Sequence, residues 1–224
     1  MKKCVGLAIG GLMFIVWSSF VQAGDFEGIL HMKTIHSDKD RATTMDWYIK
    51  GEQARIEVVR SDGKQHVMIL DNQARTMLMP ISDKHVYIEL SLDQAGGQTH
   101  EHMKEALETH SVERTGKMDK IAGYSCEVWQ IKDHDTNKLE HEICVAEGFG
   151  KAATFWMDPK QIQQSSQPAW ITQLVQEGGF GLRTIRYGED GKETSRTEAT
   201  GIERKNLDKS LFTIPEDYTK IGAR

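Results

Sequence analysis

The most constraining feature of this sequence is a two-residue alternation between apolar and polar side chains through most of its first half. A β-strand sends successive side chains to opposite faces, so this alternation predicts strands that each bury one face. Short β-rich runs carry the pattern, and turn-forming residues separate them. The runs cover residues 26–32, 45–49, 54–58, 66–70, 75–79 and 84–90. The first half is therefore predicted to form a meander of six antiparallel strands.

The second half mixes strands with two helical segments. Strands resume near Val112, and the later ones cover residues 124–132, 139–147, 180–187 and 194–204. The helical segments are residues 99–110, which are mostly charged, and residues 158–177, which have an apolar side. These elements predict a mainly β (α+β) fold, in which a single antiparallel half-barrel sheet is closed by about two helices.

The first 23 residues have the three parts of an export signal. A pair of lysines is followed by an uncharged run that starts at Cys4 and ends in Val21-Gln22-Ala23, where small side chains suit a signal peptidase. A retained membrane anchor and a lipoprotein anchor are the alternatives. Several glycines weaken the first because they dilute the apolar run, and Cys4 weakens the second because it precedes that run. We expect cleavage after Ala23, a periplasmic location, and one domain over residues 24–224 that does not span the membrane.

The charge of this mature part excludes one class of partner. Removing Lys2 and Lys3 from the 28 basic residues leaves 26 against 33 acidic residues, a net charge of −7. Nucleic-acid binding depends on a basic surface that displaces counterions from phosphates. We therefore expect no nucleic-acid partner.

The mature part keeps two cysteines, Cys126 and Cys144. An even pair in an oxidising compartment predicts a disulfide, whereas a redox-active pair usually has the C-x-x-C spacing, which is absent. The cysteines lie in two β-rich runs joined by a turn centred on Asp135, and a regular hairpin would place them directly opposite each other. A disulfide that closes this 18-residue loop is expected to stabilise the fold by about 3 kcal/mol.

Alternation also predicts which side chains line the inner side of the sheet. The expected lining of an apolar cavity is Met45, Trp47, Ile56, Val58, Ile69, Met77 and Ile88. The first sheet is rich in methionine, whose flexible side chain suits both ordinary core filling and an adaptable site for a lipid or acyl ligand. Both interpretations remain open at this stage.

No pattern in the sequence predicts catalysis or a metal site. His100 and His102, with His110 beyond them, could offer imidazoles to a metal, but His100 and His102 would point about 200° apart on a helix and neither has a histidine four residues further on. Ser165 and Ser166 lie in no G-x-S-x-G motif, and no phosphate-binding glycine loop is present. We expect a protein that is not an enzyme and that has no catalytic residue, no metal and no cofactor.

Several short motifs resemble a family of exported bacterial proteins described only as a domain of unknown function. They are Phe26-Glu27-Gly28, residues 48–51 and 54–57, residues 121–129, Gly178-Gly179-Phe180 and residues 211–215. That family is similar to the LolA/LolB lipoprotein-carrier superfamily. The resemblance implies an antiparallel half-barrel closed by helices over an apolar cavity. The motifs mark turns and core positions, so they indicate a fold and no activity.

Three functions are consistent with these observations. The first is a periplasmic, non-enzymatic binding or carrier protein for a lipid, a lipoprotein acyl chain or another apolar ligand. The second is an interaction or stress-sensing protein that binds another polypeptide of the cell envelope. The third is an enzyme that uses the same cavity, for which the sequence offers no catalytic group.

Overall fold

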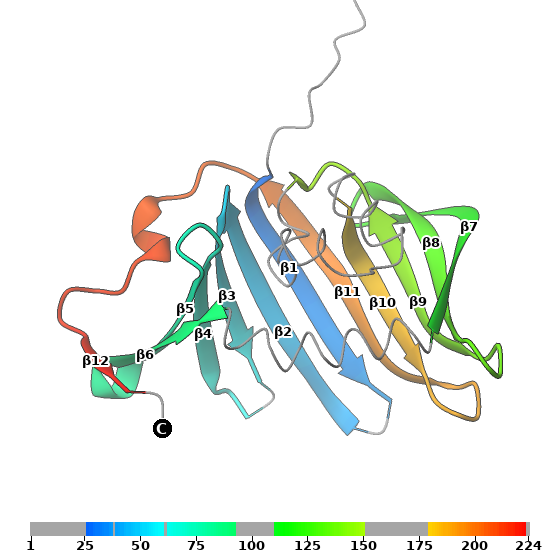
Figure 1. Cartoon of the computed structure of the whole chain (residues 1–224), viewed down its shortest axis with the longest axis horizontal. Helices are drawn as coiled ribbons and strands as arrows, with labels where there is room; N and C mark the ends of the chain where they lie inside the picture. The colour runs from blue at the N-terminus through cyan, green and yellow to red at the C-terminus, as the bar shows by residue number, and fades with distance from the viewer. Residues whose placement is uncertain (1–25, 38, 61, 93–109, 151–178, 223–224) are drawn as a thin grey trace, which may run out of the picture.

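The computed structural model describes residues 26–37, 39–60, 62–92, 110–150 and 179–222. These residues form one twelve-stranded sheet (Figure 1). The strands are β1 (Glu27–His36), β2 (Lys39–Lys50), β3 (Gln53–Val59), β4 (Gln65–Asp71), β5 (Thr76–Ile81), β6 (Val86–Ser91), β7 (His110–Ile121), β8 (Tyr124–Asp133), β9 (Leu139–Ala146), β10 (Phe180–Tyr187), β11 (Glu193–Arg204) and β12 (Thr219–Ile221). Two 3-10 helices, η1 (Ser82–Lys84) and η3 (Lys209–Phe212), complete the described elements.

Two meanders meet in the middle of this sheet. The strand order is β12-β6-β5-β4-β3-β2-β1-β11-β10-β9-β8-β7, so the pairing of β1 with β11 joins a β1–β6 meander to a β7–β11 meander. All ladders between these eleven strands are antiparallel, and the short β12 pairs with β6 in parallel. The predicted mainly β fold and the six-strand meander are confirmed.

The register of the β1–β6 meander gives each of its faces a distinct composition. Directly opposite residues share a face, and Leu30, Trp47, Ile56 and Met68 follow one another across four strands. We call this side the methionine face, because Met32, Met45, Met68, Met77 and Met79 all belong to it. The opposite side carries Ile29, Tyr48, Ile69 and Leu78.

A segment after β11 covers that opposite side, and we call residues 205–218 the strap. Its Leu207 and Phe212 are buried with Ile29 and Ile69 in one apolar cluster. Polar contacts fix its path: the Lys50 ammonium donates to the Leu207 carbonyl at 2.8 Å, and the Arg55 guanidinium donates to the Leu211 carbonyl at 3.3 Å. Part of this side of the meander is therefore already covered by the chain itself.

The predicted disulfide between Cys126 and Cys144 is present, and both residues are buried in the main apolar cluster. Its predicted register is wrong in detail. Cys144 pairs with Val128 in the β8–β9 ladder, because Glu140 is an extra residue in β9 that shifts the register beside the turn. The disulfide therefore runs diagonally between the strands, with 5.3 Å between the two Cα atoms.

The two predicted helices fall largely outside the described residues. Residues 99–109 and 158–177 belong to the part of the chain about which the structure makes no statement, as do the predicted signal peptide and its cleavage site. His110 is a correction, because it begins β7 and does not end a helix. Among the described residues, no helix combines the length and the apolar character that crossing a membrane requires.

Candidate functional site

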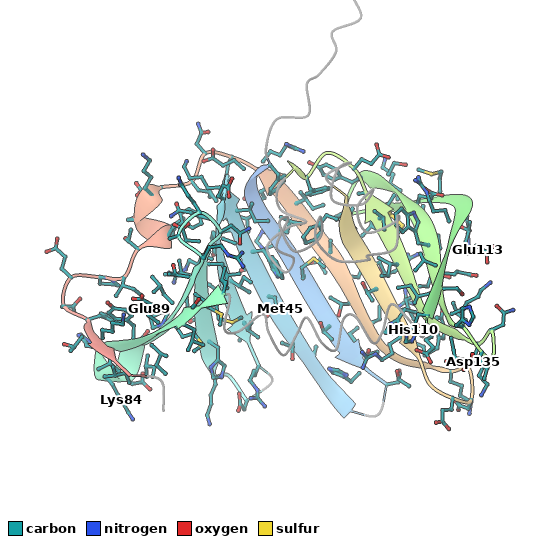
Figure 2. All side chains as sticks on the ribbon, in the orientation of Figure 1. Met45, Lys84, Glu89, His110, Glu113 and Asp135 are labelled. Atoms are coloured by element: carbon teal, nitrogen blue, oxygen red, sulfur yellow. A yellow bond between two sulfur atoms is a disulfide. The ribbon has the colours of Figure 1, made fainter. Side chains whose placement is uncertain are left out.

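Six of the seven predicted lining residues share the methionine face. Met45 and Trp47 come from β2, Ile56 and Val58 from β3, Met77 from β5 and Ile88 from β6. The ladders between β2 and β6 contain no register shift, so their alternation is carried unbroken across the meander. Figure 2 labels Met45 in the middle of the sheet and Glu89 on β6.

Ile69 is the exception, because it lies on the opposite side and packs against Leu207 and Phe212 of the strap. The run from Val67 to Leu70 is apolar at every position, so alternation within β4 does not show which side chains face which way. Pairing decides it: Ile69 is opposite Arg55, and Met68 is opposite Ile56. Sequence reasoning thus missed Met68 and Leu70, the apolar β4 residues that the methionine face does contain.

Across β2–β5 the methionine face carries both buried and half-buried side chains. Trp47 and Ile56 are 7% and 1% exposed. The Trp47 ring meets the Phe180 ring edge-on at a centroid distance of 5.9 Å, and Phe180 in turn contacts Phe149 at 5.5 Å. Met45, Val58, Met68 and Met77 are only partly buried. The half-buried methionines and Val58 thus share the face with a buried tryptophan that packs against Phe180.

Charged groups are separated from this apolar surface. Between Thr43 and Leu90, the described strand residues on the methionine face include one titratable group, His66, at the exposed start of β4. The opposite side carries paired charges, such as Arg55 with Glu57 at 2.6 Å. A ligand on the methionine face would therefore meet hydrocarbon and thioether groups.

The most distinct polar cluster of the β1–β2–β11 region lies on that opposite side. The Nδ1 atom of His31 is 2.7 Å from a carboxylate oxygen of Asp46, and Nε2 is 3.4 Å from Glu203. The hydrogen bond to Asp46 is the main reason that the pKa of His31 is raised above its ordinary value, and burial opposes it. This arrangement favours the charged imidazole, and its hydrogen bonds within the described part of the chain involve two carboxylates.

The described residues contain no group of three histidine, cysteine or acidic side chains placed to hold a metal ion. His110, which was considered above as a third metal ligand beside His100 and His102, forms a hydrogen bond through Nε2 with Glu140 at 2.7 Å. His100, His102, Ser165 and Ser166 belong to the part of the chain that is not described.

A hollow of about 320 Å³ lies away from the methionine face, between two hairpin turns. Its lining consists of Lys138, Leu139, Tyr187, Gly188, Glu189, Asp190 and Gly191. These residues belong to the turns of the β8–β9 and β10–β11 hairpins and to the strand ends beside them, and none of them is a predicted lining residue.

Several solved structures are similar to this chain at low sequence identity. An uncharacterized conserved protein from Thermus thermophilus is 9% identical, with 90% of this chain and 93% of that chain covered and a TM-score of 0.51. The MucA/MucB complex of Pseudomonas aeruginosa is matched at 9% identity over 85% of this chain and 56% of that chain, with a TM-score of 0.47. A LolA superfamily protein from Nitrosomonas europaea is matched at 11% identity over 86% and 91%, with a TM-score of 0.33. No curated protein matches the sequence.

A family described as "Domain of unknown function (DUF4412)" matches residues 26–218. This range spans the motifs from Phe26-Glu27-Gly28 to residues 211–215, so the predicted resemblance to a family described as a domain of unknown function is confirmed. The chain therefore belongs to the DUF4412 family, a domain of unknown function.

Proposed function

We propose that this protein is an exported, non-enzymatic binding or carrier protein that holds a lipid, an acyl chain or another apolar group against the methionine face. The observation that carries the proposal is the composition of that face, which combines an uncharged strand surface with half-buried methionines. The proposed lining is Met45, Trp47, Ile56, Val58, Met68, Leu70, Met77 and Ile88.

Methionine suits a ligand of variable shape. Its side chain is unbranched and flexible, so a surface of methionines can adapt to acyl chains of different length without a fixed polar anchor. The buried Trp47 and Ile56 would form the rigid base, and Met45, Val58 and Met77 would adjust around the ligand. The other side of the meander is a poorer candidate because the strap already occupies it.

The two predicted helices belong to this proposal as the cover of the ligand. The chain between Leu92 and His110 joins β6 to β7, which lie near opposite ends of the strand order (Figure 1). A helix in this connection that crosses the methionine face would shield a bound acyl chain from water. The amphipathic pattern of residues 158–177 is consistent with the same role.

Export and cleavage after Ala23 complete the proposal. A buried disulfide is typical of proteins that fold in an oxidising compartment, and the first 23 residues have the pattern of a signal peptide. The mature protein is expected to begin at Gly24, which the intact mass of the exported protein checks.

Binding of a fluorescent fatty acid, with phospholipid as competitor, tests the proposal through two neighbouring residues on opposite faces. Val58 lies on the methionine face, whereas Val59 lies on the other and is 41% exposed. Val58→Glu places a carboxylate against the ligand, so we expect the affinity to fall about tenfold or more. Val59→Glu is the matched control and should bind as the unchanged protein does.

Equal binding by both variants, or binding no tighter than to a compact control protein, would rule out the methionine face as the site. Native mass spectrometry after gentle purification separates the remaining functions. A copurified lipid supports a carrier, and a copurified polypeptide favours an envelope interaction protein instead.

A further inference from the structure

The last strand, β12, is unlike every other strand of the sheet. It is three residues long, it is paired in parallel with β6 while the other ladders are antiparallel, and all three residues are exposed. Thr219 is opposite Val86, and Ile221 is opposite Ile88. Without β12, the β6 edge would expose its backbone N–H and C=O groups, which is the situation in which sheets recruit another strand.

Polar contacts at the surface hold β12 in place. The backbone N–H of Thr219 donates to the His85 carbonyl at 2.9 Å. His85 Nδ1 is 2.7 Å from Asp217, and its ring stacks on Tyr218 at a centroid distance of 5.4 Å. Lys220 is paired with Glu89 at 2.8 Å. The side chains of both pairs, His85 with Asp217 and Lys220 with Glu89, are at least one-third exposed. Each exposed pair of this kind contributes little to stability.

The strap before β12 is anchored differently. Phe212 is buried in the apolar cluster on the β1–β6 meander, so the part of the strap up to Ile214 remains attached when Asp217, Tyr218 and β12 separate. Between Phe212 and β12 the chain makes one turn, closed by the Tyr218 N–H bond to the Pro215 carbonyl at 3.1 Å. Local opening at this turn would release β12 while leaving the core intact.

We propose that the β6 edge is an exchange site that accepts the C-terminal strand of a second copy of this chain. A second copy supplies the same strand with the same register. Its Asp217 and Tyr218 can contact His85, and its Lys220 can pair with Glu89, as they do within one chain. Exchange therefore loses no contact of β12 and requires only that the turn at Pro215 opens, which makes swapping of an identical element a low-cost route to a dimer. An unrelated peptide would have to provide these side chains independently. The inference concerns the sheet edge and does not depend on the proposed ligand.

Disulfide trapping between two differently tagged copies tests this exchange. One copy carries Thr219→Cys and the other Val86→Cys, two positions that are directly opposite in the β12–β6 ladder and whose side chains make none of the contacts described above. After mild oxidation, we expect a covalent heterodimer on a non-reducing gel. Removing residues 219–224 from the Val86→Cys copy leaves its edge open and should raise the yield.

Two controls make the result decisive. Ser210→Cys lies in the same C-terminal segment, before the turn, and is exposed, so with Val86→Cys it measures random collision. A single chain that carries both Thr219→Cys and Val86→Cys should cross-link within itself, which verifies that the ladder accepts the bond. A heterodimer yield well above the Ser210→Cys pair supports exchange. A yield equal to that pair, with the single chain cross-linked, overturns the proposal.

Discussion

Gly28 occupies the one described position where the sheet cannot accommodate a side chain. It lies in β1 opposite Arg204, with a φ of 154°. A Cβ atom at this position would overlap with the Glu203 carbonyl group of β11, which is backbone and cannot rotate away. The glycine of the Phe26-Glu27-Gly28 motif thus permits the close approach of the two strands that join the meanders.

Gly28→Ala should therefore lower the free energy of unfolding by about 2 kcal/mol or more. The matched control is Gly63→Ala. Gly63 also has a positive φ of 79°, but its Cβ would meet nothing within 4 Å, so the expected loss is about 1 kcal/mol from backbone strain alone. Urea denaturation of both variants measures the difference. Equal losses would show that the strands do not approach each other as closely as described.

Among the elements, the strap determines which side of the meander remains available. Phe212 is 4% exposed and packs in a cluster with Ile69, so Phe212→Ala should lower the free energy of unfolding by about 3–5 kcal/mol. Lys209→Ala, in the same 3-10 helix but exposed, should change it by less than about 0.5 kcal/mol. Combining Phe212→Ala with Ile69→Ala should cost less than the sum of the single losses, because both remove the same contact. Additive losses in chemical denaturation would contradict this packing.

The same elements show how far the sequence alone could predict the structure. The strands of the first meander and the hairpin of β8 and β9 were predictable because alternation and turn residues are local signals. The side on which Ile69 lies was not, because β4 is apolar at consecutive positions and only its pairing with β3 fixes the faces. The diagonal disulfide depends on one extra residue, Glu140, and β12 depends on contacts made far along the chain. The methionine face was thus predictable strand by strand, except where both faces of a strand are buried.

At the scale of the whole molecule, one hydrogen bond reports how strongly the β7–β10 end of the sheet curves. Arg183 in β10 donates to Asp119 in β7 at 2.8 Å, although β9 and β8 lie between these strands. Neighbouring strands are about 4.8 Å apart, so β10 and β7 would be about 14 Å apart in a flat sheet. Side chains leave a sheet roughly perpendicular to its plane, so an arginine and an aspartate two intervening strands apart would not meet in a flat sheet, and β7 curls back toward β10. The open sheet is therefore strongly curved at this end.

Arg183 also interacts with carboxylates from three other strands, so the stability of the curled end depends on pH. Its side chain is 13% exposed, with Glu142 at 3.9 Å and Glu198 at 3.8 Å in addition to Asp119. A backbone bond from the Lys120 N–H and the bond from Arg183 lower the pKa of Asp119 below its ordinary 3.8. Because the folded pKa is the lower one, the stabilisation from ionised Asp119 is complete above pH 3.8 and is lost as the pH falls through the folded pKa.

Arg183→Gln leaves these carboxylates without their shared cation, so the variant should unfold at a lower urea concentration than the unchanged protein at pH 7. Protonation relieves the repulsion between them, so the difference should shrink as the pH falls below about 4. Arg196→Gln is the matched control. Arg196 is 37% exposed and pairs with Glu193 and Glu198 on its own strand, so its loss should have a smaller effect at pH 7. If Arg183→Gln unfolds no earlier than Arg196→Gln at neutral pH, then the bond to Asp119 does not hold the curled end of the sheet, and packing around the Cys126–Cys144 disulfide must do so instead.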